Sequence, residues 1–265
     1  MIASPIIHFV SGLPRSGSTL LCNLLNQNPR FYVTSTSGIL DILFTVRNAW
    51  DGVLEFKASP NEEGKRRVLK GILESYYSDV QQPLIFDKSR GWLAYLEMAE
   101  MVLEREAKVL VPVRDLRDVI ASFEKLWRKN SDSRQFGQEA NNYFKWQTIE
   151  GRCEIWCSQE QPVGIAYNRI KDAIQRGFKD RLHFVPYEEL TAYPAKTMAK
   201  IYSFLEEQTP FVHNFDTIEQ TVFEDDLIHG IPDLHTIRTA VEPQQSQWQE
   251  ILGDAGKQYA GLELW

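Results

Sequence analysis

This sequence of 265 residues contains few cysteines, no long hydrophobic run and no excess of basic residues. There are three cysteines, Cys22, Cys153 and Cys157. They are too few for a disulfide framework, and an odd number cannot all pair. Cys153 and Cys157 stand four residues apart, with no cluster of His or Cys that would complete a metal site. We therefore expect reduced, buried thiols and no bound metal.

No apolar run approaches the ~18 residues that suggest a membrane span. The first 11 residues also lack the basic start and long apolar core of a signal peptide. These absences predict a cytoplasmic protein with no membrane partner. The formal net charge of −7 argues against a nucleic-acid partner, because proteins that bind phosphate backbones concentrate Lys and Arg. A local basic pocket for one small anion is compatible with this balance.

Strand-like and helix-like segments alternate along the chain. Buried strands are predicted at residues 6–11, 83–88, 108–114 and 182–187. Helices are predicted at residues 18–27, 39–50, 65–79, 92–104, 116–128 and 193–205, with long helical patterns around 137–159 and 163–177. Residues 34–38 are predicted to form a polar loop, and residues 51–65 an exposed connection. The alternation predicts an α/β fold, a parallel sheet with helices on both faces and ligands at the carboxyl ends of the strands.

A phosphate-binding loop, Gly12-Leu-Pro-Arg-Ser-Gly-Ser-Thr19, follows the first predicted strand and opens the first helix. Backbone amides in such a loop converge on an anion at the helix N-terminus. The spacing from Gly12 to Gly17 is that of the Walker loop, but Ser18 stands where that loop has its lysine. A cation lies inside the loop instead, at Arg15. This arrangement suits a ligand with one bridging oxygen to neutralise and no metal-bound triphosphate tail.

A second anion site is predicted where the strand at residues 108–114 ends. Arg114 at a strand end can fork onto phosphate oxygens, and Ser122, two helical turns later, can add a hydroxyl donor. The charged residues between them, Asp115, Arg117 and Asp118, fit an ordinary helix start, in which acids complement the dipole and pair with the arginine.

Both segments resemble the sulfotransferase superfamily. The loop is similar to the family's 5′-phosphosulfate motif, Pro-Lys/Arg-Ser-Gly-Thr/Ser-Thr, and Arg114 with Ser122 matches its 3′-phosphate motif. The resemblance implies the donor 3′-phosphoadenosine 5′-phosphosulfate and the product 3′-phosphoadenosine 5′-phosphate. It implies that Arg15 contacts the bridging and sulfuryl oxygens. The implied binding residues of the loop are Pro14, Arg15, Ser16, Gly17, Ser18 and Thr19.

The resemblance covers most of the chain and is closest to the tyrosylprotein branch and its bacterial relatives. Residues 185–190, Val-Pro-Tyr-Glu-Glu-Leu, are similar to that branch's Val-His-Tyr-Glu-Gln-Leu, which implies that Tyr187 lies beside the nucleotide. Residues 237–238, Ile-Arg, and 246–248, Ser-Gln-Trp, resemble its Ile-Lys and Ser-Lys-Trp. Arg238 would then be a cation that closes over the phosphates. We expect one domain over residues 1–265, with a segment from about residue 208 onward closing over the site.

Lys88 ends a predicted strand and matches the family's strand-end lysine, which implies that it stabilises the transition state. The catalytic bases of the two known branches have no matching residue in this sequence. Counted without gaps from the loop, the glutamate of the tyrosylprotein branch falls on Thr36, and the histidine of the cytosolic small-molecule branch falls on Arg90. Asp41 and His229 are two substitute candidates. An acceptor that is already anionic would need no base at all.

The function predicted is metal-free transfer of a sulfuryl group to a hydroxyl or amine of a small-molecule or peptide acceptor. Two other interpretations stay open. One is a P-loop kinase or nucleotide hydrolase, for which Asp87 is the plausible strand-end acid. The other is a nucleotide-binding module without catalysis. The sequence identifies neither the acceptor nor the oligomeric state.

Overall fold

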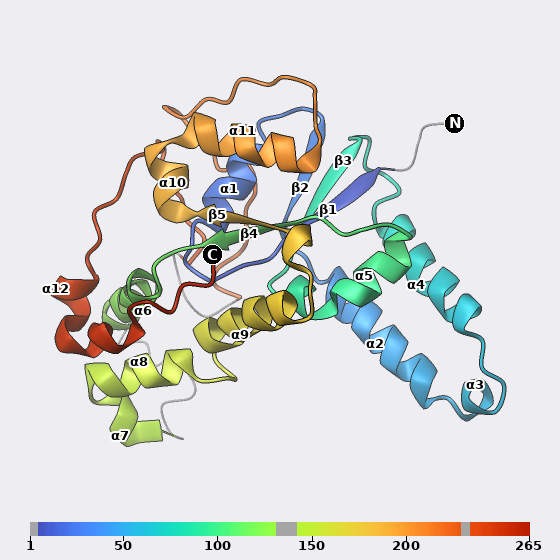
Figure 1. Ribbon diagram of the computed structural model, residues 1–265, viewed down its shortest axis with the longest axis horizontal. Helices are drawn as coiled ribbons and strands as arrows, with labels where there is room; N and C mark the ends of the chain where they lie inside the picture. Colours follow the sequence, from blue (N-terminus) through green and yellow to red (C-terminus); the bar gives the residue numbers. More distant parts are fainter. Residues whose placement is uncertain (1–4, 131–141, 229–233) are drawn as a thin grey trace.

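The computed structural model describes residues 5–130, 142–228 and 234–265, and its centre is a five-stranded sheet (Figure 1). The strands are β1 (Ile6–Val10), β2 (Phe31–Thr36), β3 (Leu84–Lys88), β4 (Val109–Val113) and β5 (Leu182–Pro186). Every pairing is parallel, and the order across the sheet is β2-β3-β1-β4-β5. The predicted α/β fold with a central parallel sheet is confirmed.

Helices fill the connections between the strands and continue after the last one. They are α1 (Ser18–Leu25), α2 (Ile39–Gly52), α3 (Leu54–Ala58), α4 (Glu62–Tyr76), η1 (Trp92–Tyr95), α5 (Leu96–Leu103), α6 (Leu116–Asn130), α7 (Tyr143–Trp146), α8 (Ile149–Cys157), α9 (Pro162–Gln175), η4 (Lys179–Arg181), α10 (Tyr187–Ala192), α11 (Pro194–Leu205), α12 (Trp248–Leu252) and η5 (Gly253–Tyr259). Within the described ranges, no helix combines the length and the hydropathy that crossing a membrane requires.

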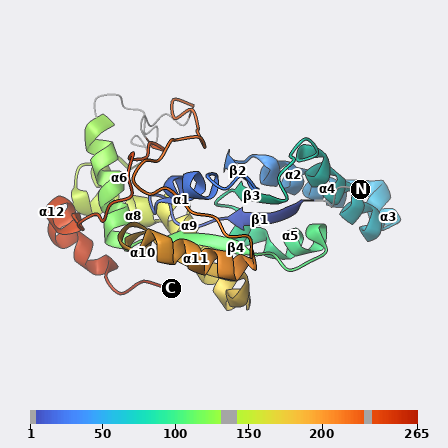
Figure 2. The same ribbon diagram turned by 90° about the horizontal axis from the view of Figure 1, so that it is seen from above.

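Side chains alternate between the two faces of the sheet, and each face has its own core. Phe9 and Val111 pack on one face with α2, α5, α6 and α9, whereas Val10 and Leu110 pack on the other with α1 and α11. Figure 1 shows α1 and α11 above the sheet and α5 and α9 below it. Figure 2 shows α6, α8 and α12 gathered at one end of the molecule and α2 to α4 at the other. Helices therefore cover both faces, as predicted.

Two local predictions were wrong. β2 continues through residues 34–36, where a polar loop was predicted, and α3 interrupts the connection at 51–65. β2 lies at the edge of the sheet, where Ser and Thr side chains can stay polar. The Thr34 hydroxyl also accepts a hydrogen bond from the Lys88 amide at 2.9 Å, which ties the polar end of β2 to β3. The extension matters because it carries Thr36 to the level of Lys88.

A buried ion pair holds α6 against α8. The Glu124 carboxylate is fully buried and accepts hydrogen bonds from Arg152 Nε at 2.8 Å and Nη2 at 2.7 Å. The Arg152 guanidinium also lies 3.9 Å from the centre of the Trp127 ring and donates to the Trp146 carbonyl at 2.7 Å. Buried charges with this degree of hydrogen bonding fix the geometry of the helices that carry them. The pair therefore fixes α6, the helix on which Ser122 lies.

Candidate functional site

The carboxyl ends of the strands meet around the loop that follows β1. Lys88 is the last residue of β3, Arg114 directly follows β4, and Tyr187 directly follows β5. The chain moves from β1 toward β2 and β3 on one side and then to β4 and β5 on the other, so the strand order reverses at β1. Ligands bind at such switch points in open parallel sheets. The loop therefore lies between Lys88 on one side and Arg114 on the other.

A cavity of about 520 Å³ opens at this edge of the sheet. Its volume is typical of small-molecule sites. The basic residues that line it are Arg15, Lys88, Arg90, Arg114, Lys125 and Arg238, and the acidic ones are Asp118, Glu224 and Glu242. Basic side chains thus outnumber acidic ones here, although the whole chain carries a net charge of −7. Such a local excess of positive charge attracts an anionic ligand.

Two glycines of the loop stand where a side chain has no space. A β-carbon on Gly12 would lie 2.2 Å from the Pro112 carbonyl oxygen, because β1 and β4 approach closely there. Gly17 has a φ of 80° and caps α1, and a β-carbon on it would lie 2.6 Å from the Tyr187 ring. L-residues rarely adopt this backbone conformation. The glycine spacing is therefore required by packing as well as by the bend of the loop.

The amides at the start of α1 point to an anion site. The first hydrogen bond of the helix runs from the Leu21 amide to the Gly17 carbonyl, so the amides before Leu21 have no partner inside the helix. Residues 18–19 line the cavity. The Ser16 hydroxyl instead turns inward and donates to the Leu13 carbonyl at 2.6 Å. Of the loop residues predicted to bind phosphate, Ser16 would therefore act through its amide.

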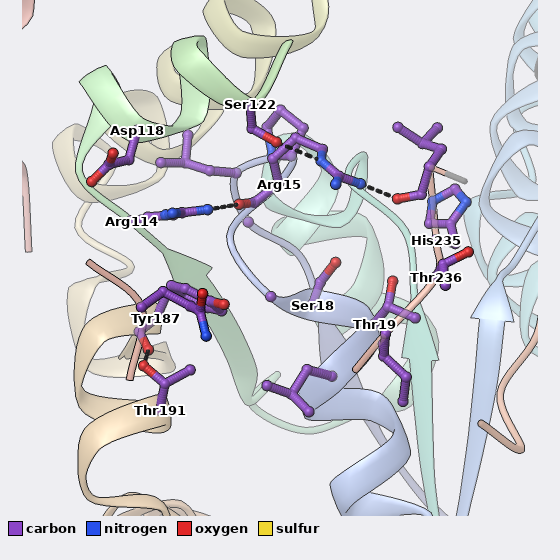
Figure 3. Close-up of a pocket in the computed structure, with 18 of the residues that line it drawn as sticks. Arg15, Ser18, Thr19, Arg114, Asp118, Ser122, Tyr187, Thr191, His235 and Thr236 are labelled. Atoms are coloured by element: carbon purple, nitrogen blue, oxygen red, sulfur yellow. Dashed lines mark hydrogen bonds between the residues drawn. The ribbon is translucent and has the colours of Figure 1, made fainter. Parts of the chain in front are cut away.

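The two predicted phosphate sites are in direct contact (Figure 3). Arg15 Nε donates to Ser122 Oγ at 3.0 Å, and Arg114 Nη1 donates to the Arg15 carbonyl at 3.4 Å. The Arg114 guanidinium lies 4.5 Å from the centre of the Tyr187 ring. Its buried Nε has no hydrogen-bond partner among the described residues. Burial, and next the repulsion of Arg114, lower the pKa of Arg15. An anion between these groups would relieve the repulsion and supply the missing acceptor.

Lys88 meets a carboxylate that the sequence did not indicate. Its Nζ lies 2.8 Å from Glu224 Oε1, and the side chains are only 9% and 8% exposed. The same oxygen accepts hydrogen bonds from the Thr36 amide at 2.9 Å and the Thr36 hydroxyl at 2.7 Å. Burial opposes the charge of Glu224, but the charge and hydrogen bond of Lys88, the hydrogen bond of Thr36 and the charge of His235 together outweigh it and lower the pKa of this carboxyl to about 2. A carboxylate therefore lies beside Thr36, where the tyrosylprotein branch would have its glutamate, but it belongs to Glu224, 188 residues further along the chain.

His235 is a second titratable group of the cavity that the sequence did not indicate. Its Nδ1 lies 2.6 Å from Asp226 Oδ1 and 3.7 Å from Glu224 Oε2. Burial lowers the pKa of His235, although the hydrogen bond to Asp226 opposes this shift. Asp226 thus holds the imidazole in one orientation at the cavity wall.

Of the two predicted base candidates, Asp41 alone belongs to the described residues. Asp41 is exposed on α2 and is not one of the residues that line the cavity. His229 lies outside the described residues. Arg90, at the position where the cytosolic small-molecule branch has its histidine, does line the cavity.

The segment after α11 is anchored on both sides of the cavity. The Asn23 side chain on α1 accepts hydrogen bonds from the amides of residues 221–222 at 2.7 and 2.8 Å. Asp118 on α6 accepts from the amides of residues 247–248 at 3.1 and 3.2 Å. Asp118 therefore ties the start of α12 to α6, and it also lies in the first turn of α6, as the charged helix start predicted. Arg238 lies between the two anchors and lines the cavity.

Known proteins resemble the chain over most of its length. The structure of a sulfotransferase domain from the curacin biosynthetic pathway has a TM-score of 0.57 at 17% identity, covering 98% of this chain and 97% of that one. A sulfotransferase from Alicyclobacillus acidocaldarius has a TM-score of 0.50 at 16% identity, covering 88% and 89%. These structures share the fold. No curated protein matches the sequence. The sulfotransferase family model matches residues 5–210, and the chain belongs to the sulfotransferase family.

Proposed function

We propose that the chain transfers a sulfuryl group from 3′-phosphoadenosine 5′-phosphosulfate to a hydroxyl or amine of a small-molecule or peptide acceptor, by in-line transfer. The contact of Arg15 with both Ser122 and Arg114 carries this proposal. It joins the two predicted phosphate sites into one cationic surface, which suits a nucleotide phosphorylated at both the 5′ and the 3′ position. The donor supplies an activated sulfuryl group on the oxygen that bridges to its 5′-phosphate.

The lining residues divide into binding and charge-neutralising groups. The amides at the start of α1 and the hydroxyls of residues 18–19 would hold the 5′-phosphate. Arg114 and Ser122 would hold the 3′-phosphate. Arg15 and Lys88 would neutralise charge on the bridging oxygen as its bond to sulfur breaks, which is the main task of a protein in this type of transfer.

Tyr187 and Arg238 complete the proposed nucleotide site. The Tyr187 ring packs against both the Arg114 guanidinium and Gly17, which supports a position for it between the two proposed phosphate sites. Arg238 belongs to the segment that is anchored at residues 221–222 and 247–248. This segment would close over the nucleotide within a single domain. The likeness to the tyrosylprotein branch stays a prediction from residues 185–190 and 237–248.

The kinase or hydrolase interpretation is not favoured. It requires a strand-end acid that is available to a metal ion. Asp87 is fully buried, and its carboxylate accepts hydrogen bonds from Trp92 Nε1 at 2.6 Å and from the Tyr77 hydroxyl. Burial raises the pKa of Asp87. This acid serves the core, and Ser18 stands where a Walker lysine would be.

Transfer of labelled sulfate tests the proposal. The protein is incubated with donor labelled in its sulfuryl group and with a fractionated metabolite extract, and sulfated products are identified by mass spectrometry. We expect label to move to at least one acceptor, and to move far more slowly from a donor that lacks the 3′-phosphate. A wild-type protein that moves no label to any fraction would instead be a nucleotide-binding module without catalysis.

A further inference from the structure

The position of Glu224 has a high cost in free energy. Burying a carboxylate costs several kcal/mol unless it is paired and hydrogen-bonded, and Glu224 has both Lys88 and Thr36 as partners. A negative charge in this cavity also repels an anionic nucleotide. A carboxylate that only neutralised Lys88 would therefore oppose the binding that the rest of the cavity favours. This conflict suggests that Glu224 has a task in the reaction.

The order of the strands places Glu224 on the acceptor side of the cavity. The proposed 3′-phosphate site lies at β4 and α6, and the loop with Arg15 follows β1. Lys88 ends β3 and Thr36 ends β2, so Glu224 lies on the far side of the loop from Arg114. In-line transfer requires the acceptor to approach sulfur from the side opposite the leaving oxygen. With the donor bound as proposed, that approach would run along the edge of β3 and β2, where Glu224 lies.

The charged groups around Glu224 come from several elements. Lys88 on β3 is the cation in contact with it, and Arg90, after β3, also experiences its charge. His235, from the same segment as Glu224, lies 3.7 Å from its second oxygen and is hydrogen-bonded to Asp226. Burial lowers the pKa of His235, which disfavours the charged form of the imidazole. Lys88 is therefore the main counter-charge of Glu224.

We propose that Glu224 is the general base of the reaction and that donor binding activates it by exchanging the partner of Lys88. The inference rests on the proposed function. Once Lys88 turns to the donor, Glu224 keeps its hydrogen bonds to Thr36 but no longer has the charge of Lys88 beside it, so it becomes a stronger base. As the acceptor oxygen bonds to sulfur, its proton passes to Glu224. The bond from sulfur to the bridging oxygen breaks, its electron pair stays on the 5′-phosphate, and Lys88 and Arg15 balance that charge.

Glu224→Gln tests the base, with Asp225→Asn as its matched control. Asp225 is the adjacent, exposed carboxylate and does not line the cavity, so its loss changes the net charge equally. Using a panel of alcohols and phenols as acceptors, we expect Glu224→Gln to lower kcat by about 10²- to 10³-fold for weakly acidic acceptors. The loss should shrink to less than about threefold for 4-nitrophenol above its own pKa, because that acceptor has already lost its proton. Asp225→Asn should stay within about twofold of wild type.

Binding of the product nucleotide gives a second readout that needs no turnover. Glu224→Gln removes a charge that repels the nucleotide and releases Lys88, so affinity for 3′-phosphoadenosine 5′-phosphate should rise about threefold or more. The pH profile should change as well. As the pH rises, wild-type kcat should increase to a plateau as the Glu224 carboxyl loses its proton, and this step should disappear in Glu224→Gln.

Several outcomes would overturn the inference. One is an equal loss of kcat for acidic and weakly acidic acceptors, which indicates a structural role. Another is weaker nucleotide binding by Glu224→Gln. A third is near-wild-type turnover by Glu224→Gln together with loss of turnover by His235→Gln, which would make the imidazole the base. If the wild type transfers no sulfate at all, the proposed function fails, whereas tighter nucleotide binding by Glu224→Gln would still support the exchange of partners by Lys88.

Discussion

Replacing Lys88 with methionine is expected to lower kcat by about 10²- to 10³-fold, the usual cost of removing one group that stabilises developing charge. Methionine keeps the unbranched shape of the side chain, one atom shorter, and removes its charge. Affinity for the product nucleotide should fall by less than about tenfold, because the loop and Arg114 supply most of the phosphate contacts. Steady-state kinetics for kcat and calorimetry for the dissociation constant measure the two effects separately.

The substitution also removes the charge of Lys88 from beside the buried Glu224 carboxylate. Removing one partner of a buried pair costs about 3–5 kcal/mol, so Lys88→Met alone should lower the melting temperature. The double variant Lys88→Met, Glu224→Gln should recover stability and still turn over slowly. Lys196→Met, an exposed lysine on α11, is the control and should change neither quantity. If the double variant recovers turnover together with stability, Lys88 acts only by holding the fold.

Arg114→Ala is expected to erase the preference for a 3′-phosphate. Affinity for 3′-phosphoadenosine 5′-phosphate should fall about 10²-fold, because hydrogen bonds to charged groups contribute about 1.5–3 kcal/mol each and a guanidinium can make two of them. Affinity for AMP should change only slightly, since AMP has no 3′-phosphate. Isothermal calorimetry with both ligands measures the two values on the same protein.

Two further variants make the Arg114 experiment specific. Arg114→Lys keeps the charge and loses the planar fork, so it should recover only part of the affinity. Arg67→Gln, an exposed arginine on α4, removes a similar charge far from the cavity and should bind as wild type. An equal loss of affinity for AMP and for the bisphosphate in Arg114→Ala would mean that this residue supports the loop and does not read the 3′ position.

The general fold could be predicted because its determinants are local. The strands β1, β3, β4 and β5 are short apolar runs, and the glycines of the loop identify the turn from β1 to α1. The edge strand β2 was missed because its last residues are Thr and Ser, which are typical of loops as well. Its extension depends on pairing with β3, including the hydrogen bond from the Lys88 amide to Thr34, and that contact joins residues 54 positions apart.

The basic half of the site could be predicted for the same reason. Arg15, Lys88 and Arg114 each end or follow a strand, and a parallel sheet brings the carboxyl ends of its strands together. Glu224 and His235 could not be found in this way. They lie between α11 and α12, where none of the described residues is in a helix or strand, and hydrogen bonds such as those from the amides of residues 221–222 to the Asn23 side chain position that part of the chain. No sequence pattern indicates contacts over such distances along the chain.

Calorimetry of the wild-type protein with two nucleotides tests the central claim most directly. 3′-Phosphoadenosine 5′-phosphate and AMP are each titrated into the protein in buffer that contains a magnesium chelator. The arrangement of Arg15, Arg114 and Ser122 predicts magnesium-independent binding of the bisphosphate, at least about 10²-fold tighter than binding of AMP. Equal affinities for the two nucleotides, or binding that appears only when magnesium is added, would contradict a site built for the 3′-phosphorylated donor.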